Sequence, residues 1–193
     1  MRFSKYVMMA FMLMTAGVAG AAGQATPGGA DQQKNVDEMC KVTICQHNVH
    51  VVLKQQDGSV FDRTFDVLPG VVEPNWLVIV AGQTLHIEAD RVGNGLANFK
   101  LVDTVRHPEK TLTLSFEQAK DGSMLLQLTN PYNWPLKFDM GMMPLDGERL
   151  LKTSSCPVMA GGSSFETWPQ PIFQVVLAKP RFLDAGAKRA ACD

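Results

Sequence analysis

The chain has 193 residues, of which 46% are hydrophobic and 19% charged, and its formal net charge is −1. This composition is typical of a globular protein and excludes collagen-like, coiled-coil and disordered chains. The near balance of charge also argues against a nucleic-acid-binding protein, which needs a broad basic face. At this length we expect one domain with a sizeable core.

The first 25 residues have the organisation of a secretory signal peptide. Arg2 and Lys5 supply a positive start, residues 7–14 form an apolar centre, and residues 16–25 are almost entirely alanine and glycine. Because signal peptidase requires small residues at its cleavage site, we expect cleavage between residues 21 and 25. The apolar centre is much shorter than the roughly 20 residues of a membrane-spanning helix. The mature protein is therefore predicted to be soluble and without a transmembrane segment.

The cysteines are expected to form two disulfides, because both candidate compartments, a bacterial periplasm and a eukaryotic secretory route, are oxidising. Three pairings of Cys40, Cys45, Cys156 and Cys192 are possible. The sequence slightly favours Cys40–Cys45 with Cys156–Cys192, although the close pair can bond only across a tight turn. The absence of any Asn-X-Ser/Thr sequon favours the periplasm. A zinc site at the first two cysteines is disfavoured by their spacing.

Short strand-like segments alternate with turn signals between a flexible leader at residues 26–39 and a polar tail at residues 185–193. Apolar and polar residues alternate with the period of two that half-buried strands show. Asp-Gly pairs at residues 57–58, 121–122 and 146–147 are strong hairpin signals. The expected strands are residues 48–54, 60–65, 76–80, 83–88, 99–102, 111–116, 124–128, 136–140, 148–151 and 172–177.

About ten short strands within residues 40–184, without an amphipathic helix, define the expected fold. It is all-β: a single immunoglobulin-like antiparallel β-sandwich, stapled by disulfides.

No catalytic motif is recognisable in the sequence. A phosphate-binding glycine loop, Gly-X-Ser-X-Gly and His-Glu-X-X-His are all missing. Carboxylates recur close together at Asp62 and Asp66 and at Glu88 and Asp90, but solvated strand faces explain such pairs more simply than acid–base catalysis. We therefore expect no catalytic residue and no cofactor, and a glycan-acting enzyme is the least favoured alternative.

The loop at residues 130–135 is the strongest candidate for a binding surface. Two prolines stiffen it, so the rings of Tyr132 and Trp134 are displayed at little entropic cost. Trp168, also beside a proline, is added as an adjacent contact residue. The competing interpretation, that these rings plug the open ends of the sandwich, is the favoured one for the rings themselves.

A second candidate is the methionine cluster of Met140, Met142 and Met143. Met140 and Met142 would share one face of a strand, and thioethers are suitable ligands for Cu(I). Methionine is also a common core residue, and this is the favoured interpretation.

The function that the sequence favours is that of an exported binding protein of the bacterial periplasm. Its expected partner is another envelope or secreted protein, which it would engage as an inhibitor, an immunity protein or a chaperone does. A periplasmic copper-binding protein that uses the methionines is the main alternative.

Overall fold

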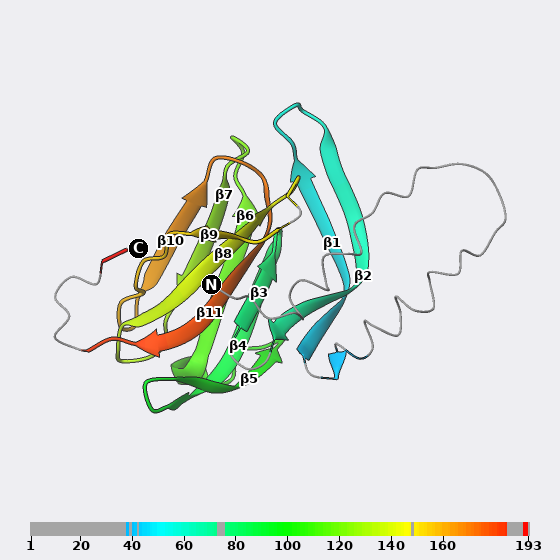
Figure 1. The fold of residues 1–193 in the computed structure, drawn as a ribbon. Coiled ribbons are helices and arrows are strands. Elements are labelled where there is room, and N and C mark those ends of the chain that lie inside the picture. Colours follow the sequence, from blue (N-terminus) through cyan, green and yellow to red (C-terminus); the bar gives the residue numbers. More distant parts are fainter. Residues whose placement is uncertain are drawn as a thin grey trace.

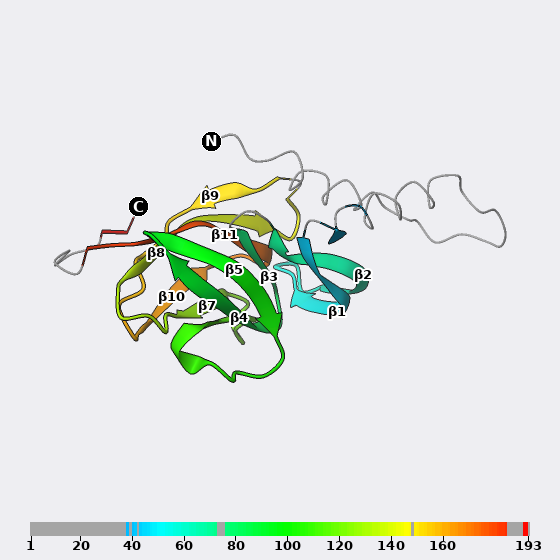
Figure 2. The same cartoon turned by 90° about the horizontal axis from the view of Figure 1, so that it is seen from below.

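Two antiparallel β-sheets face each other and form a sandwich (Figure 1). The computed structural model describes residues 38, 40–41, 43–72, 76–147, 149–184 and 191–192. The predicted signal peptide at residues 1–25 lies outside the described residues, as do residues 26–37 of the leader and 185–190 of the tail. The expected all-β antiparallel sandwich is confirmed, and Figure 2 shows its two layers end-on.

The six-stranded sheet has the order β1-β2-β3-β11-β8-β9, and the five-stranded sheet has the order β10-β7-β6-β4-β5. The first consists of β1 (Thr43–Lys54), β2 (Val60–Val72), β3 (Trp76–Val80), β11 (Ile172–Phe182), β8 (Leu136–Pro144) and β9 (Leu151–Thr153). The second consists of β10 (Ser163–Trp168), β7 (Met124–Thr129), β6 (Thr111–Gln118), β4 (Gln83–Val92) and β5 (Gly95–Val102). A short 3-10 helix, η2 (Pro108–Lys110), precedes β6.

The core lies between the sheets. It is filled by the side chains that point inward, which are every second residue along most strands. On the five-stranded side it contains Leu85, Ile87, Leu112, Leu114, Phe116, Met124, Leu126 and Leu128, and on the six-stranded side Leu77, Ile79, Leu136, Phe138, Met140, Val175 and Leu177. Burying this much apolar surface is the main term that stabilises the fold.

Two of the Asp-Gly turns use the same local chemistry. At Asp57-Gly58 the glycine has φ +86°, and at Asp121-Gly122 it has φ +88°, a region that residues with a Cβ rarely adopt. In each turn the aspartate accepts hydrogen bonds from the backbone amide and the hydroxyl of the serine that follows, Ser59 or Ser123. Both predicted hairpin turns are confirmed.

Two elements differ from the prediction. Strand β10 was not expected. Its sequence Ser-Ser-Phe-Glu-Thr-Trp has polar residues on both faces, so it shows no clear alternation of apolar and polar residues. The prediction of a strand at residues 148–151 is wrong, because β9 begins only at Leu151. Glu148 lies outside the described residues. Leu150 leaves the sheet because its side chain packs over Gly141, where an added Cβ would lie 2.9 Å from Leu150.

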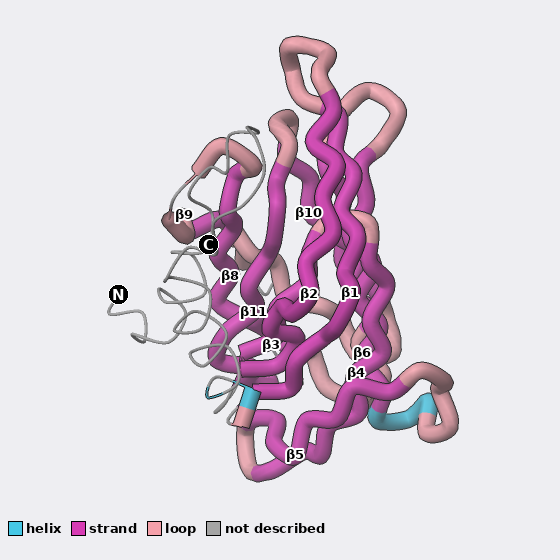
Figure 3. Tube along the Cα trace, turned by 90° about the vertical axis from the view of Figure 1, so that its right-hand side faces the viewer, coloured by secondary structure: helices cyan, strands magenta, loops and turns pink. Residues whose placement is uncertain are grey.

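The β1–β2 hairpin extends beyond the rest of the sandwich (Figure 3), and β1 is the edge strand of the six-stranded sheet. Glutamine side chains connect this strand to the five-stranded sheet. Gln118 accepts from the backbone amide of Lys54 and donates to its carbonyl, both at 2.8 Å. Gln83 donates to Gln46 at 2.6 Å. Because the amide of Gln118 pairs as a neighbouring strand would, it satisfies backbone groups at the edge of β1.

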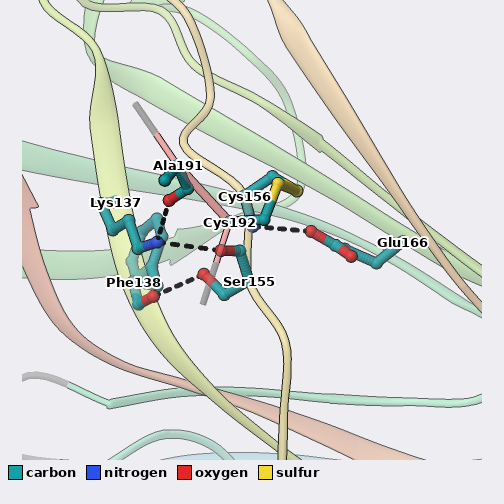
Figure 4. Close-up of a disulfide and its surroundings, with 7 residues drawn as sticks. All are labelled: Lys137, Phe138, Ser155, Cys156, Glu166, Ala191 and Cys192. Atoms are coloured by element: carbon teal, nitrogen blue, oxygen red, sulfur yellow. Dashed lines mark hydrogen bonds between the residues drawn. A yellow bond between two sulfur atoms is a disulfide. The ribbon is translucent and has the colours of Figure 1, made fainter. Parts of the chain in front are cut away.

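On the opposite side, the C-terminal tail is fastened to β8 (Figure 4). The structure joins Cys156 to Cys192, and it joins Cys40 to Cys45, which is the slightly favoured pairing. The buried ammonium of Lys137 donates to the carbonyls of Ser155 and Ala191, each at 2.9 Å. The tail residue therefore satisfies part of a buried charge, which would be costly to leave without acceptors.

Loss of the Cys156–Cys192 disulfide is expected to destabilise the protein more than loss of Cys40–Cys45. The bonded cysteines are 36 and 5 residues apart, respectively. Loop-closure entropy then gives stabilisation of about 4 and about 2 kcal/mol. Urea unfolding of the two double Cys→Ser variants measures both values. Equal losses of stability in the two variants would show that attaching the tail stabilises little besides the tail itself.

A charge cluster occupies the outer face of the six-stranded sheet, where a bulge in β11 gives Lys179 a φ of +52°. Lys179 and Arg181 each donate to Asp139 at 2.9 Å. Although partial burial opposes it, the hydrogen bond from Lys179 and the charge of Arg181 lower the pKa of Asp139. A lowered folded-state pKa stabilises the fold at pH above the unfolded value and loses this effect as the pH falls.

Asp139→Asn is therefore expected to cost about 1 kcal/mol at pH 7. The difference from wild type should shrink as the pH falls through and below 3.8, the ordinary value for aspartate. Urea unfolding as a function of pH measures it, with the exposed Asp66→Asn as a control that should show no such pH-dependent loss. A difference that persists undiminished to pH 2 would contradict the ion-pair explanation.

Candidate functional site

The loop between β7 and β8 is organised by a buried asparagine. Asn130 is fully buried, and its amide nitrogen lies 2.8 Å from the carbonyl oxygen of Trp134, 3.0 Å from that of Val158 and 3.1 Å from that of Met159. Its side-chain oxygen accepts a bond from the backbone amide of Tyr132 at 3.0 Å. One side chain therefore ties the loop to itself and to the segment that precedes β10.

Tyr132 points from this loop into the end of the core, and its side chain is only 7% exposed. Its hydroxyl donates to the carbonyl of Ala89 at 2.6 Å and lies 3.3 Å from that of Lys110. Burial, reinforced by the negative charge of Asp90, raises the pKa of Tyr132. The ring thus joins the β7–β8 loop to β4 and lies almost entirely inside the protein.

Trp134 is 39% exposed and lies beside two side chains that come from other elements. The guanidinium carbon of Arg91, at the end of β4, is 3.7 Å from the centre of the Trp134 ring. The ring of Phe182, the last residue of β11, meets Trp134 edge-on at 6.4 Å between centres. Phe182 also lies edge-on to Tyr132, at 5.2 Å. We call Trp134, Arg91 and Phe182 the aromatic–arginine cluster.

The two sheets together position this cluster. The backbone amide of Phe182, in the six-stranded sheet, donates to the carbonyl of Asn94 at 2.9 Å, in the turn between β4 and β5 of the other sheet. This bond holds the end of β11 against the end of β4, next to the β7–β8 loop. Three segments far apart in the sequence therefore meet at one end of the sandwich.

The structure does not bring Trp168 to this cluster. Trp168 pairs with Met124 at the start of β7, whereas Tyr132 follows the end of β7. The six-residue strand β7 runs between these positions, a rise of about 17 Å. The Trp168 ring is 6% exposed, packs edge-on against Phe116 at 6.0 Å, and donates its indole N–H to Thr153 at 3.0 Å. Of the three predicted contact residues, Trp134 is the one whose ring is substantially exposed.

The methionine cluster lies largely inside the protein. Met140 pairs with Leu177 and Met142 with Val175, so both face the core, as expected of strand neighbours two residues apart. Met140 and Met143 are buried, and Met142 is partly buried. These thioethers pack with apolar side chains, as core methionines do.

Two carboxylates of the pairs noted in the sequence, Asp62 and Asp90, each take part in a separate interaction at the surface. Asp62 accepts from His50 at 2.8 Å on the exposed face of the hairpin. Asp90 accepts from Asn98 at 3.1 Å and lies 3.6 Å from the ammonium of Lys110; these two partners lower its pKa. Among the described residues, histidine, cysteine, aspartate and glutamate form no group of three or more that could hold a metal ion.

Sequence reasoning did not identify Arg91 or Phe182 as members of the site. Nothing local distinguishes either residue, since Arg91 is one charge near a turn and Phe182 is one apolar residue near a strand end. The only sequence signal was the stiff loop that carries Trp134.

These features define a class: an antiparallel β-sandwich with two disulfides and an aromatic–arginine cluster at one end. Comparisons with protein-family models, curated proteins and solved structures find no match for the chain. In the part of the chain that the structure describes, no helix is long and apolar enough to cross a membrane. The disulfides are consistent with an extracellular protein.

Proposed function

We propose that this chain is an exported binding protein of the bacterial periplasm that engages another envelope or secreted protein, as an inhibitor, immunity protein or chaperone does. It performs no catalysis in this role. The binding surface is the end of the sandwich formed by the aromatic–arginine cluster. The sequence of residues 1–25 and the two disulfides support export to an oxidising compartment.

The observation that carries the proposal is the partly exposed Trp134 with Arg91 stacked on it at 3.7 Å. Tryptophan and arginine are the residue types most enriched at the energetic centres of protein interfaces. A ring on a loop fixed by Asn130 and two prolines loses little conformational entropy when it is covered. Two exposed apolar residues, Val92 at the end of β4 and Met159 in the segment before β10, add surface that a partner can bury.

The test is isolation of the full chain from its own envelope after chemical cross-linking, followed by mass spectrometry. Trp134→Ala is compared with Phe165→Ala, a matched control because Phe165 is 60% exposed and lies on β10. We expect one partner chain to be captured by wild type and by Phe165→Ala and lost with Trp134→Ala. Equal capture by all three proteins would contradict the assigned surface, and no captured chain would contradict the binding function.

A further inference from the structure

We propose that Arg91 is a carboxylate-binding residue, and that the partner delivers to it an acidic side chain. This inference rests on the proposed function and specifies the chemistry of the same surface. It follows from how the guanidinium is held and from the groups that surround it.

The guanidinium of Arg91 is fixed by rings and by one weak hydrogen bond. Its carbon lies 3.7 Å from the ring centre of Trp134 and 4.8 Å from that of Phe182. Its Nε donates to the carbonyl of Gly93 at 3.4 Å. The two terminal nitrogens make no hydrogen bond to the described residues, so four N–H groups remain available at the edge of an oriented plane.

No carboxylate among the described residues neutralises this cation. Within the described residues, Arg91 has no ion pair, and its sequence neighbour Asp90 is occupied by Lys110 and Asn98. By contrast, Lys179 and Arg181 both bind a carboxylate, that of Asp139. Arg91 is therefore stacked and oriented without the acidic partner that usually accompanies such a residue.

This arrangement fits a carboxylate better than other ligands. The planar guanidinium fork matches the two oxygens of a carboxylate, and stacking leaves its edge free while ordering it in advance. One cation balances one carboxylate charge, whereas a phosphate group carries more charge than this site offers. The adjoining exposed Val92 and Met159 suit the apolar surface that surrounds an acidic side chain on a protein.

The test uses a defined probe, because the natural partner is unidentified. N-acetyl-glutamic acid amide carries one side-chain carboxylate, and N-acetyl-glutamine amide is its neutral isostere. Each is titrated into the full mature chain while the Arg91 Nε–H and the Trp134 indole N–H signals are followed by NMR. We expect saturable shifts of both signals with the acidic probe and none with the neutral probe. Arg91→Gln should remove the Trp134 shift, and Arg91→Lys should weaken binding about tenfold.

Arg63→Gln is the matched control, since Arg63 lies over a different ring, Phe65, at 5.9 Å, and should leave the titration unchanged. A Trp134 shift that survives in Arg91→Gln, equal shifts with both probes, or no saturation with the acidic probe would overturn the inference. Tighter binding of inorganic phosphate than of the acidic probe would also overturn it. If the cross-linked partner is lost with Trp134→Ala but kept with Arg91→Gln, the binding function stands and this inference alone fails.

Discussion

Replacing Tyr132 with alanine is expected to lower the free energy of unfolding by about 4 kcal/mol. The substitution removes a buried ring from the end of the core and leaves the carbonyl of Ala89 without the hydroxyl that bonds it at 2.6 Å. Trp134→Ala is expected to cost only about 1 kcal/mol, because its ring is partly exposed and mainly loses the stack with Arg91. Urea unfolding followed by circular dichroism measures both.

Tyr132→Phe separates the ring from its hydroxyl. It keeps the packing against Phe182 and removes only the hydrogen bonds, so we expect a loss of about 1 kcal/mol. The opposite order, in which Trp134→Ala destabilises more than Tyr132→Ala, would mean that Trp134 is the structural plug. That result would remove the main reason for placing the binding surface at this end.

Asn130→Ala is expected to destabilise the protein by about 3 kcal/mol, a large effect for a polar residue. The asparagine is fully buried, and the two N–H groups of its amide are shared among three nearby carbonyl oxygens, which would lose these donors. Because the same bonds fix the loop backbone, the Trp134 indole N–H signal should also broaden or shift. Urea unfolding and an NMR spectrum of the variant measure the two effects.

Asn133→Ala is the control within the same loop, because Asn133 is exposed and makes no hydrogen bond to the described residues. It should change stability by less than about 0.5 kcal/mol. Asn130→Asp should destabilise more than Asn130→Ala, since a carboxylate would then face three carbonyl oxygens. If Asn130→Ala proved as harmless as Asn133→Ala, the loop would have to be held by its prolines and by Tyr132.

Much of the fold could be predicted because its signals are local. The alternation of Leu112, Leu114 and Phe116 with polar neighbours gives a strand whose buried face is visible in the sequence. The Asp-Gly turns at residues 57–58 and 121–122 require a positive φ that glycine adopts readily. These features depend on residues only a few positions apart, so no tertiary information is needed to detect them.

Strand β10 and the start of β9 show where local signals fail. Strand β10 forms because β7 offers a partner along its whole length, from Ser163 opposite Thr129 to Trp168 opposite Met124. Four of its six residues are polar, so its own composition does not reveal a core face. Leu150 is an apolar residue of the kind that strands contain, but it packs over the outer face of the sheet instead of joining a strand. In both cases a long-range contact outweighs intrinsic preference.

The candidate site divides in the same way. The sequence alone determined that residues 130–135 form a stiff loop that carries two aromatic rings, since the prolines restrict the backbone wherever the loop lies. Only the tertiary structure decided that Tyr132 turns inward, that Trp168 lies at the other end of β7, and that Trp134 meets Arg91. A strand pattern specifies which face of a strand is buried, whereas the ends that meet are set by the pairing of distant strands, here by β11 reaching the turn after β4.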